Sequence, residues 1–364
     1  MDDRIYQIAL SQLQGIGPHK AKTLVSYLGS PEAVFTENES SISKIEGIGS
    51  LAAKSMNREY ALEIAKRELD YVEREMVKVL FYKSENYPKK LKHCDDGPIV
   101  LFGKGRLDFD ARNIAIVGTR KATSYGKKMV EELLIDLIDY DTQIVSGLAF
   151  GIDIHAHKEA LKNNIPTVAV LGTGFENMHP TSHRSVAKEM EVNGGIITEF
   201  LSDSIVDPSN FPKRNRIVAG ICDATIVVES ADKGGSMITA RLAMDYNRDV
   251  FAYPGNADKF SSSGCNSLIK SNKAMLMTCS EDLIKTMAWE NENAFGSVQT
   301  NLFIELSNEE ESLVEVLRTK GELDIDTLGF ETGLTSSQMA LNLLNLELKG
   351  AIQSLPGKKY KAIN

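Results

Sequence analysis

The stretch Asn113-Ile-Ala-Ile-Val-Gly-Thr-Arg120 begins a pattern of short apolar runs that alternate with longer helical segments. Short β-branched runs of this kind are typical of strands that are buried on both faces. The seven predicted strands are Ile114–Val117, Gln143–Val145, Thr167–Leu171, Gly195–Thr198, Ala224–Val228, Asp249–Ala252 and Ala274–Met277. Strands that alternate with helices indicate right-handed βαβ units. The sequence therefore predicts an α/β fold with a doubly wound parallel sheet, to which the segment between Val79 and Gly105 adds an edge strand.

An internal repeat marks the N-terminal region. Leu13-Gln-Gly-Ile-Gly-Pro18 recurs as Ile45-Glu-Gly-Ile-Gly-Ser50, and each copy predicts two helices joined by a Gly-Ile-Gly turn. This arrangement resembles the helix-hairpin-helix motif, whose turn glycines let backbone amides approach a DNA phosphate. We expect a helical domain over residues 1–76. Nearby acidic residues such as Glu46 dilute its positive charge, so the sequence leaves open whether the repeat contacts DNA or only packs.

The C-terminal region has a different pattern from the core, which we assign to residues 77–288. Residues 289–301 are polar and predict a linker. Three helices, Asn308–Arg318, Ile325–Thr332 and Ser336–Leu348, and a hairpin over residues 351–363 then follow in an order that resembles a winged helix, over residues 302–364. Residues 303–364 contain six Lys or Arg and ten Asp or Glu, so a structural or protein-binding role is at least as well supported as DNA binding.

Composition limits the class of protein. A chain of 364 residues predicts two or three domains, and its net charge of −9 restricts nucleic-acid contact to local basic clusters. The four cysteines lack the spacing of a metal site, and no apolar run has the length of a membrane span. The first residues lack the pattern of a secretory signal. We therefore expect a cytoplasmic protein without a membrane span.

A candidate anion site lies between Asn210 and Met244. Lys213 and Arg216 are three residues apart and share a helix face, and the ring of Phe211 is suited to stack on a base. Arg214 lies elsewhere on that turn, where pairing with a carboxylate such as Glu199 is one expectation. The loop 233–236 precedes another helix, and glycine amides at a helix N-terminus bind phosphate.

In an open α/β sheet, ligands bind beyond the carboxyl ends of the strands. Glycine-rich loops follow the first three predicted strands there. The predicted DNA-binding residues are Gly118, Thr119, Arg120, Ser146, Gly147, Phe211, Lys213, Arg214, Asn215, Arg216, Gly234, Gly235 and Ser236. The sequence contains neither the GxGxxG fingerprint nor a P-loop, and it shows no activated nucleophile. His155 and His157 are two apart on a predicted helix and cannot bind one metal together. We expect a protein that holds phosphates, without catalysis, cofactor or metal.

Five segments resemble the DprA/Smf family of DNA-processing proteins, in that family's order. They are Ile116–Arg120, Ser146–Asp153, Phe211–Gly220, Gly234–Ala240 and Asp249–Gly255, and the resemblance covers most of the chain. It implies an extended Rossmann-like core that binds single-stranded DNA, forms a homodimer, protects incoming DNA and loads the RecA recombinase during natural transformation or recombination. One departure is Pro208, which stands where some members have a DNA-contacting lysine.

An enzyme is the alternative that the sequence leaves open. The core also resembles the nucleotide phosphoribohydrolases of the Lonely Guy type, in which a glycine loop holds phosphate and a glutamate acts on the glycosidic bond. Glu199 or Glu229 would then be the acid, but Asp232-Lys-Gly-Gly-Ser236 replaces the Pro-Gly-Gly-x-Gly-Thr loop of that group. A purely structural protein is a third alternative, which would leave the basic cluster unexplained.

Overall fold

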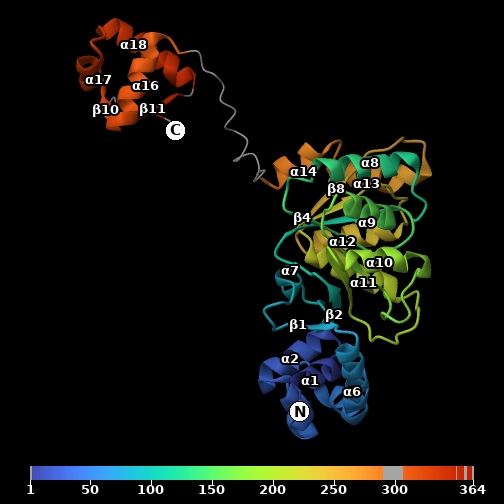
Figure 1. Cartoon of the computed structure of the whole chain (residues 1–364). Coiled ribbons are helices and arrows are strands. Elements are labelled where there is room, and N and C mark those ends of the chain that lie inside the picture. Colours follow the sequence, from blue (N-terminus) through green and yellow to red (C-terminus); the bar gives the residue numbers. More distant parts are fainter. Residues whose placement is uncertain (1, 290–305, 350, 356–358, 363–364) are drawn as a thin grey trace. The chain divides into compact units, whose positions relative to one another are not determined.

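The computed structural model describes residues 2–289, 306–349, 351–355 and 359–362. The chain divides into a unit of residues 1–292 and a unit of residues 293–364 (Figure 1). The N-terminal helices and the sheet both belong to the first unit. Most of the predicted linker lies outside the described residues. No helix of the described ranges is long and apolar enough to cross a membrane.

The first unit begins with a group of helices that contains both copies of the repeat. The helices are α1 (Asp3–Ser11), α2 (Pro18–Leu28), α3 (Pro31–Thr36), α4 (Glu39–Ser43), α5 (Gly49–Ser55) and α6 (Arg58–Arg74). Gly15 and Gly47 have φ values of 72° and 82°, a region that favours glycine. The two glycine turns join α1 to α2 and α4 to α5, as the repeat predicts.

The sheet has nine strands in the order β1-β2-β6-β5-β4-β3-β7-β8-β9. Its strands are β1 (Lys78–Phe81), β2 (Val100–Gly105), β3 (Arg112–Val117), β4 (Thr142–Ser146), β5 (Thr167–Val170), β6 (Gly194–Thr198), β7 (Ala224–Val227), β8 (Asp249–Ala252) and β9 (Met275–Leu276). The seven predicted strands are confirmed and are all parallel. The segment expected to add one edge strand instead adds two, β1 and β2, which are antiparallel.

Strand order fixes where a ligand site forms. The chain extends the sheet from β3 through β4 to β6, then returns to the other side of β3 with β7. Right-handed crossovers place the connecting helices on opposite faces in the two halves. Accordingly, α8 (Ser124–Asp136) and α9 (Ile152–Lys162) pack in one apolar cluster, and α11 (Asn210–Ile221) and α12 (Gly235–Asp245) in another. A crevice is therefore expected beyond the carboxyl ends of β3 and β7, where the strand order reverses.

Shorter helices complete the first unit, and polar contacts join its helical region to its sheet. The remaining helices are α7 (Lys89–Lys92), α10 (Arg184–Met190), α13 (Ser263–Lys270) and α14 (Ser280–Thr286). The buried carboxylate of Glu68 on α6 accepts hydrogen bonds from the backbone N–H and the hydroxyl of Ser202, at 2.8–3.1 Å. Lys22 on α2 donates to the carbonyl of Cys94 at 3.0 Å.

The second unit has the order of a winged helix, which confirms that prediction. It contains α16 (Asn308–Lys320), β10 (Leu323–Asp324), α17 (Ile325–Thr332), α18 (Ser336–Leu348), β11 (Ile352–Leu355) and β12 (Lys359–Ala362). The strands form one sheet in the order β10-β12-β11. Capping boxes begin two of the helices: Ser307 pairs with Glu310 before α16, and Thr335 with Gln338 before α18.

Candidate nucleic-acid interface

Arg120 and Phe211 meet at the carboxyl end of the sheet. Arg120 follows β3 and is exposed, and its guanidinium carbon lies 5.9 Å from the centre of the Phe211 ring at the start of α11. The imidazole of His179 lies 6.0 Å from the same ring. Lys213 is exposed two residues after Phe211, about 200° further around α11, and forms no ion pair among the described residues. The structure thus brings together two of the predicted contact residues, the exposed cation of Arg120 and the half-buried ring of Phe211.

Two glycines of the predicted rim make room for α11. A Cβ atom at Gly172 would lie 2.8 Å from the ring of Phe211, and one at Gly147 would lie 2.4 Å from the guanidinium of Arg214. Both separations are shorter than side-chain packing permits. These glycines therefore leave space for the side chains of Phe211 and Arg214. The sequence predicts a DNA contact at Gly147, but its open side is filled by Arg214.

Arg214 points into the protein. Its side chain is only 4% exposed, and Nη1 donates hydrogen bonds to the carbonyls of Gly147, at 2.6 Å, and of Val170. Burial lowers the pKa of Arg214 to about 10, a shift that nearby Asp153 opposes, so the group stays charged at neutral pH. We therefore correct the prediction that Arg214 contacts DNA: its guanidinium instead holds α11 against the ends of β4 and β5.

Two predicted hydroxyl contacts are also corrected. The Ser146 hydroxyl is buried and donates to the carbonyl of Ile116 at 2.6 Å. The Ser236 hydroxyl is 6% exposed and donates to the Ser230 hydroxyl at 2.7 Å. Because both groups are enclosed and have partners, they stabilise their loops and are not positioned to bind a phosphate.

Arg216, rather than Arg214, pairs with Glu199. The Arg216 and Glu199 side chains are 13% and 16% exposed and form a direct hydrogen-bonded ion pair. Burial raises the pKa of Glu199, and the charge of Arg216 opposes that shift. Residues 214 and 216 lie about 200° apart around a helix, so one reaches the strand ends while the other reaches Glu199. Arg216 is thus already neutralised before any DNA phosphate arrives.

The start of α12 remains the clearest anion site of the glycine loop. Gly235 is exposed, and a Cβ atom there would meet nothing within 4 Å. Gly234 is different, because its amide donates to the Ala231 carbonyl at 2.9 Å. Asn215 links the two helices by donating to the Gly235 carbonyl at 3.4 Å. The amide of Gly235 is thus the exposed one at this helix start, since Ser236 is buried and the Met237 amide donates to the Gly234 carbonyl at 3.1 Å.

Gly118 and Thr119 hold the loop that presents Arg120. A Cβ atom at Gly118 would lie 2.5 Å from the Ile152 side chain, so this glycine lets α9 approach β3. The Thr119 amide donates to the Glu229 carbonyl at 2.7 Å, and its carbonyl accepts from the Ile152 amide at 3.1 Å. Both backbone groups of Thr119 are thus used within the protein.

The two acids of the enzyme alternative are engaged elsewhere. The Glu229 carboxylate is buried and accepts from the Thr123 amide and hydroxyl at 3.0 and 3.1 Å, where Thr123 caps α8. Glu199 is paired with Arg216. To act as the acid on a glycosidic bond, either glutamate would first have to release its present partner.

The residues predicted to bind DNA did not include Phe150, an exposed ring in the loop after β4. Phe150 is 49% exposed, and its ring lies 4.8 Å from that of His183, whose Nδ1 is 2.8 Å from the Leu148 carbonyl. His179 lies beside Phe211. The available signal was an aromatic residue within a glycine-bounded loop that follows a predicted strand.

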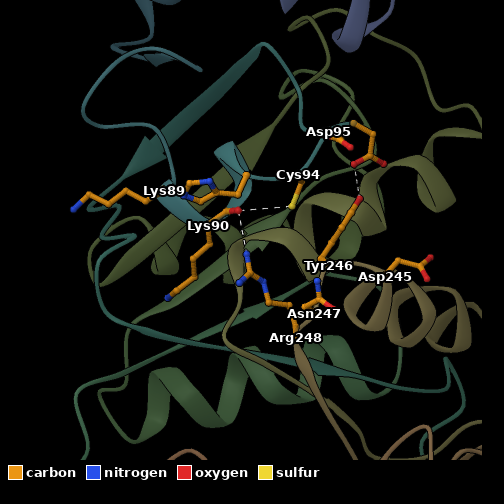
Figure 2. Close-up of a pocket in the computed structure, with 10 residues that line it drawn as sticks. Lys89, Lys90, Cys94, Asp95, Asp245, Tyr246, Asn247 and Arg248 are labelled. Atoms are coloured by element: carbon orange, nitrogen blue, oxygen red, sulfur yellow. Dashed lines mark hydrogen bonds between the residues drawn. The ribbon is translucent and has the colours of Figure 1, made fainter.

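A separate cavity of about 540 Å³ lies between α7 and the end of α12 (Figure 2). Several of its polar groups pair with one another or with neighbours, although the buried Nε of Arg248 has no hydrogen-bond partner within the described part of the chain. Lys90 binds Asp223 at 2.6 Å, Tyr246 donates to Asp96 at 2.6 Å, and Arg248 donates to the Lys90 carbonyl at 3.1 Å. Asp223 and Arg248 immediately precede β7 and β8, so this cavity is at the opposite end of the sheet from Arg120 and Phe211.

Comparison with known proteins identifies each region. Residues 78–288 match the family model of DNA recombination-mediator protein A, residues 304–358 the DprA winged helix domain, and residues 8–59 the SAM-like helix-hairpin-helix tandem. Protein Smf of Escherichia coli is 35% identical over 280 residues, which cover 75% of this chain and 74% of that protein. DNA processing protein DprA of Streptococcus pneumoniae is 38% identical over 199 residues, covering 54% and 70%.

Solved structures agree with these matches. The X-ray structure of Streptococcus pneumoniae DprA superposes with a TM-score of 0.67 and 31% identity, over 79% of this chain and 98% of that one. DNA processing protein A of Helicobacter pylori, studied for its single-stranded DNA binding mode, gives 0.53 and 30%, over 59% and 97%. The chain therefore belongs to the DNA recombination-mediator protein A family, also called the DprA/Smf family.

Proposed function

We propose that this chain binds single-stranded DNA in the crevice beyond β3 and β7 and acts as a recombination mediator. The observation that supports this most directly is the exposed guanidinium of Arg120 beside the ring of Phe211. An aromatic ring beside an exposed cation suits an unpaired base and its phosphate, because stacking tolerates any base and the cation can pair with the backbone. The Helicobacter pylori relative, with its single-stranded DNA binding mode, supports the same assignment.

The revised set of DNA-binding residues is smaller than the sequence suggested. Arg120, Phe211 and Lys213 bind the strand, and the Gly235 amide at the start of α12 holds a further phosphate. Arg214, Ser146 and Gly147 shape the crevice from within. Arg216 contributes to DNA binding only if a phosphate displaces Glu199 from it. The ion pair between Arg216 and Glu199 opposes that displacement.

Substitution at the crevice tests the proposal. Arg120→Ala and Lys213→Ala should each weaken binding of a labelled single-stranded oligonucleotide by about ten- to a hundredfold, the size of one charge-assisted hydrogen bond. The slope of log K against log salt should fall by roughly 0.7 for each phosphate that the variant no longer neutralises. Lys270→Ala removes the same charge from the exposed end of α13 and should bind like the wild type. If the wild type and the three variants bind the oligonucleotide with equal affinity, the proposal that the strand binds in this crevice is refuted.

Family membership supports the further proposal that the cytoplasmic protein is a homodimer that delivers strands to RecA without covalent chemistry. Two crevices on one particle raise the effective concentration of the second site for a long strand. Analytical ultracentrifugation should show a dimer, and the protein should accelerate RecA filament growth on strands coated with single-strand binding protein. A monomer together with release of base from nucleoside monophosphates would favour the phosphoribohydrolase instead.

A further inference from the structure

Three metal-ligating side chains converge on α8 and α9, away from the groups proposed to bind DNA. They are Glu131 of α8 and His155 and Glu159 of α9. Nε2 of His155 lies 3.1 Å from a carboxylate oxygen of Glu131, and one ligand atom from each residue lies within 4.8 Å of the other two. The cluster is partly sheltered, because the side chains of His155 and Glu159 are only 16% and 14% exposed.

We propose that this cluster binds one transition-metal dication and that Zn²⁺ is the ion that fits it. One imidazole and two carboxylates form a ligand set that Zn²⁺ accepts, whereas Mg²⁺ and Ca²⁺ prefer oxygen ligands alone. His155 and Glu159 are four residues apart and share a helix face, so the two helices supply ligands from both sides. Three protein ligands leave a fourth position for water.

Formation of the site requires a short movement and the release of Nε2 of His155 from the Lys127 carbonyl, which lies 3.3 Å away. Zn–ligand bonds of about 2.0–2.2 Å in a tetrahedron separate ligand atoms by roughly 3.3 Å, so the groups must close by about 1.5 Å. Glu131 is 44% exposed and has room to rotate inward. Glu159 must release Lys162, which it binds at 2.9 Å, but Lys162 is 70% exposed and surface ion pairs of this kind contribute little.

The sequence did not predict this set of three metal ligands, because Glu131 lies on a different helix from His155 and Glu159. His155 and His157 do point to different places, as their spacing predicts: His157 is fully buried, and its Nδ1 lies 2.7 Å from the Thr167 hydroxyl. A metal on His155 would join α8 to α9. These helices follow the loops that contain Arg120 and Gly147, so the ion would brace the crevice from outside.

Metal titration of the full chain tests the site. After removal of metals with a chelator, Co²⁺ should bind with one equivalent and give tetrahedral d–d absorption, and Zn²⁺ should displace it. X-ray absorption of the Zn²⁺ form should show nitrogen and oxygen neighbours without sulfur. Loss of an outer partner of a metal ligand costs about 10–100-fold in affinity, so losing a ligand, as in Glu131→Gln or His155→Ala, should cost at least that.

Glu132→Gln is the matched control, since Glu132 is the next residue of α8 and pairs with Lys128 instead. It should bind Zn²⁺ like the wild type. Circular dichroism of each variant confirms that folding is retained, and Glu131→Gln preserves the shape of an exposed side chain. Two results would overturn the proposal: no saturable binding by the wild type at micromolar metal, or equal binding by the wild type and both ligand variants.

Discussion

Arg214 donates hydrogen bonds from a buried guanidinium to the carbonyls of Gly147 and Val170. Removing the donor leaves two carbonyls without partners in a dry site. We therefore predict that Arg214→Ala lowers the free energy of unfolding by about 2–4 kcal/mol. Arg214→Lys keeps the charge but reaches fewer acceptors. Its free energy of unfolding should therefore lie between those of the wild type and Arg214→Ala. Urea denaturation measures this, and an Arg214→Ala protein as stable as the wild type would contradict the assigned role.

His157 should make stability depend on pH. Its imidazole is fully buried, and burial lowers its pKa from 6.5 to about 3. Below pH 6.5 the unfolded chain binds a proton that the folded protein does not. Stability is therefore lost as pH falls, by up to about 1.4 kcal/mol per pH unit between 6.5 and 3.

The His157→Asn variant isolates this contribution, because its amide can replace the Nδ1 contact with Thr167 and does not titrate. It should be less stable than the wild type at pH 7, and the difference should shrink on acidification to about pH 4.5, which lies inside the window set by the two pKa values. Parallel stability curves for the two proteins across that range would exclude the effect.

Single residues also show how far sequence reasoning reaches. The prediction that Arg120 and Phe211 lie at the same edge of the sheet agrees with the structure, because loops after parallel strands meet at one edge. That they contact DNA, with Lys213, stays a prediction. The exchange of partners between Arg214 and Arg216 was not predictable. It depends on the rotation of α11 relative to β5 and β6, which charge and spacing do not encode.

At the scale of elements, α6 is attached to the sheet domain through Glu68 and Ser202. Burial raises the pKa of Glu68, and the hydrogen bonds from Ser202 oppose that shift. Glu68→Ala should lower the free energy of unfolding by about 1–3 kcal/mol, since it leaves the buried Ser202 amide without a partner. Glu63→Ala, an exposed change on the same helix, should stay within about 0.5 kcal/mol.

A double-mutant cycle distinguishes this hydrogen-bonded link from general packing. Glu68→Ala and Ser202→Ala should show a coupling of about 1 kcal/mol in urea denaturation. Strict additivity of the two changes would show that the bond from the Ser202 hydroxyl does not contribute, which leaves only the bonds from the Ser202 amide.

The helices and the central strands were easier to predict than the strands at the edge of the sheet. The seven parallel strands followed from apolar runs because both faces of each strand are buried. The winged-helix order followed from three successive helical segments and a hairpin, and the structure adds the capping box of Thr335 before α18. The antiparallel pair β1 and β2 was only half foreseen, since an edge strand is defined by its neighbour rather than by its own pattern. The residues of the predicted linker that lie within 290–301 are outside the described residues, so its conformation stays a prediction.

At the scale of the whole molecule, the winged helix forms a unit of its own and has an acid excess. A chain ending at Trp289 should therefore keep its affinity for single-stranded DNA within about threefold, because like charge offers few phosphate partners. Fluorescence anisotropy at one salt concentration measures this. If a folded truncation loses most of its affinity, the winged helix belongs to the DNA site.

The most direct test of the proposed crevice is to compare binding of a single-stranded oligonucleotide and its duplex, at equal salt, to the wild type and to Phe211→Ala. We predict tighter binding to the single strand, and a decrease of about 1–3 kcal/mol in that preference in Phe211→Ala, because only an unpaired base can stack on the ring. Tighter binding to the duplex, or a single-strand preference that survives Phe211→Ala unchanged, would contradict the claim that the crevice holds an unpaired strand.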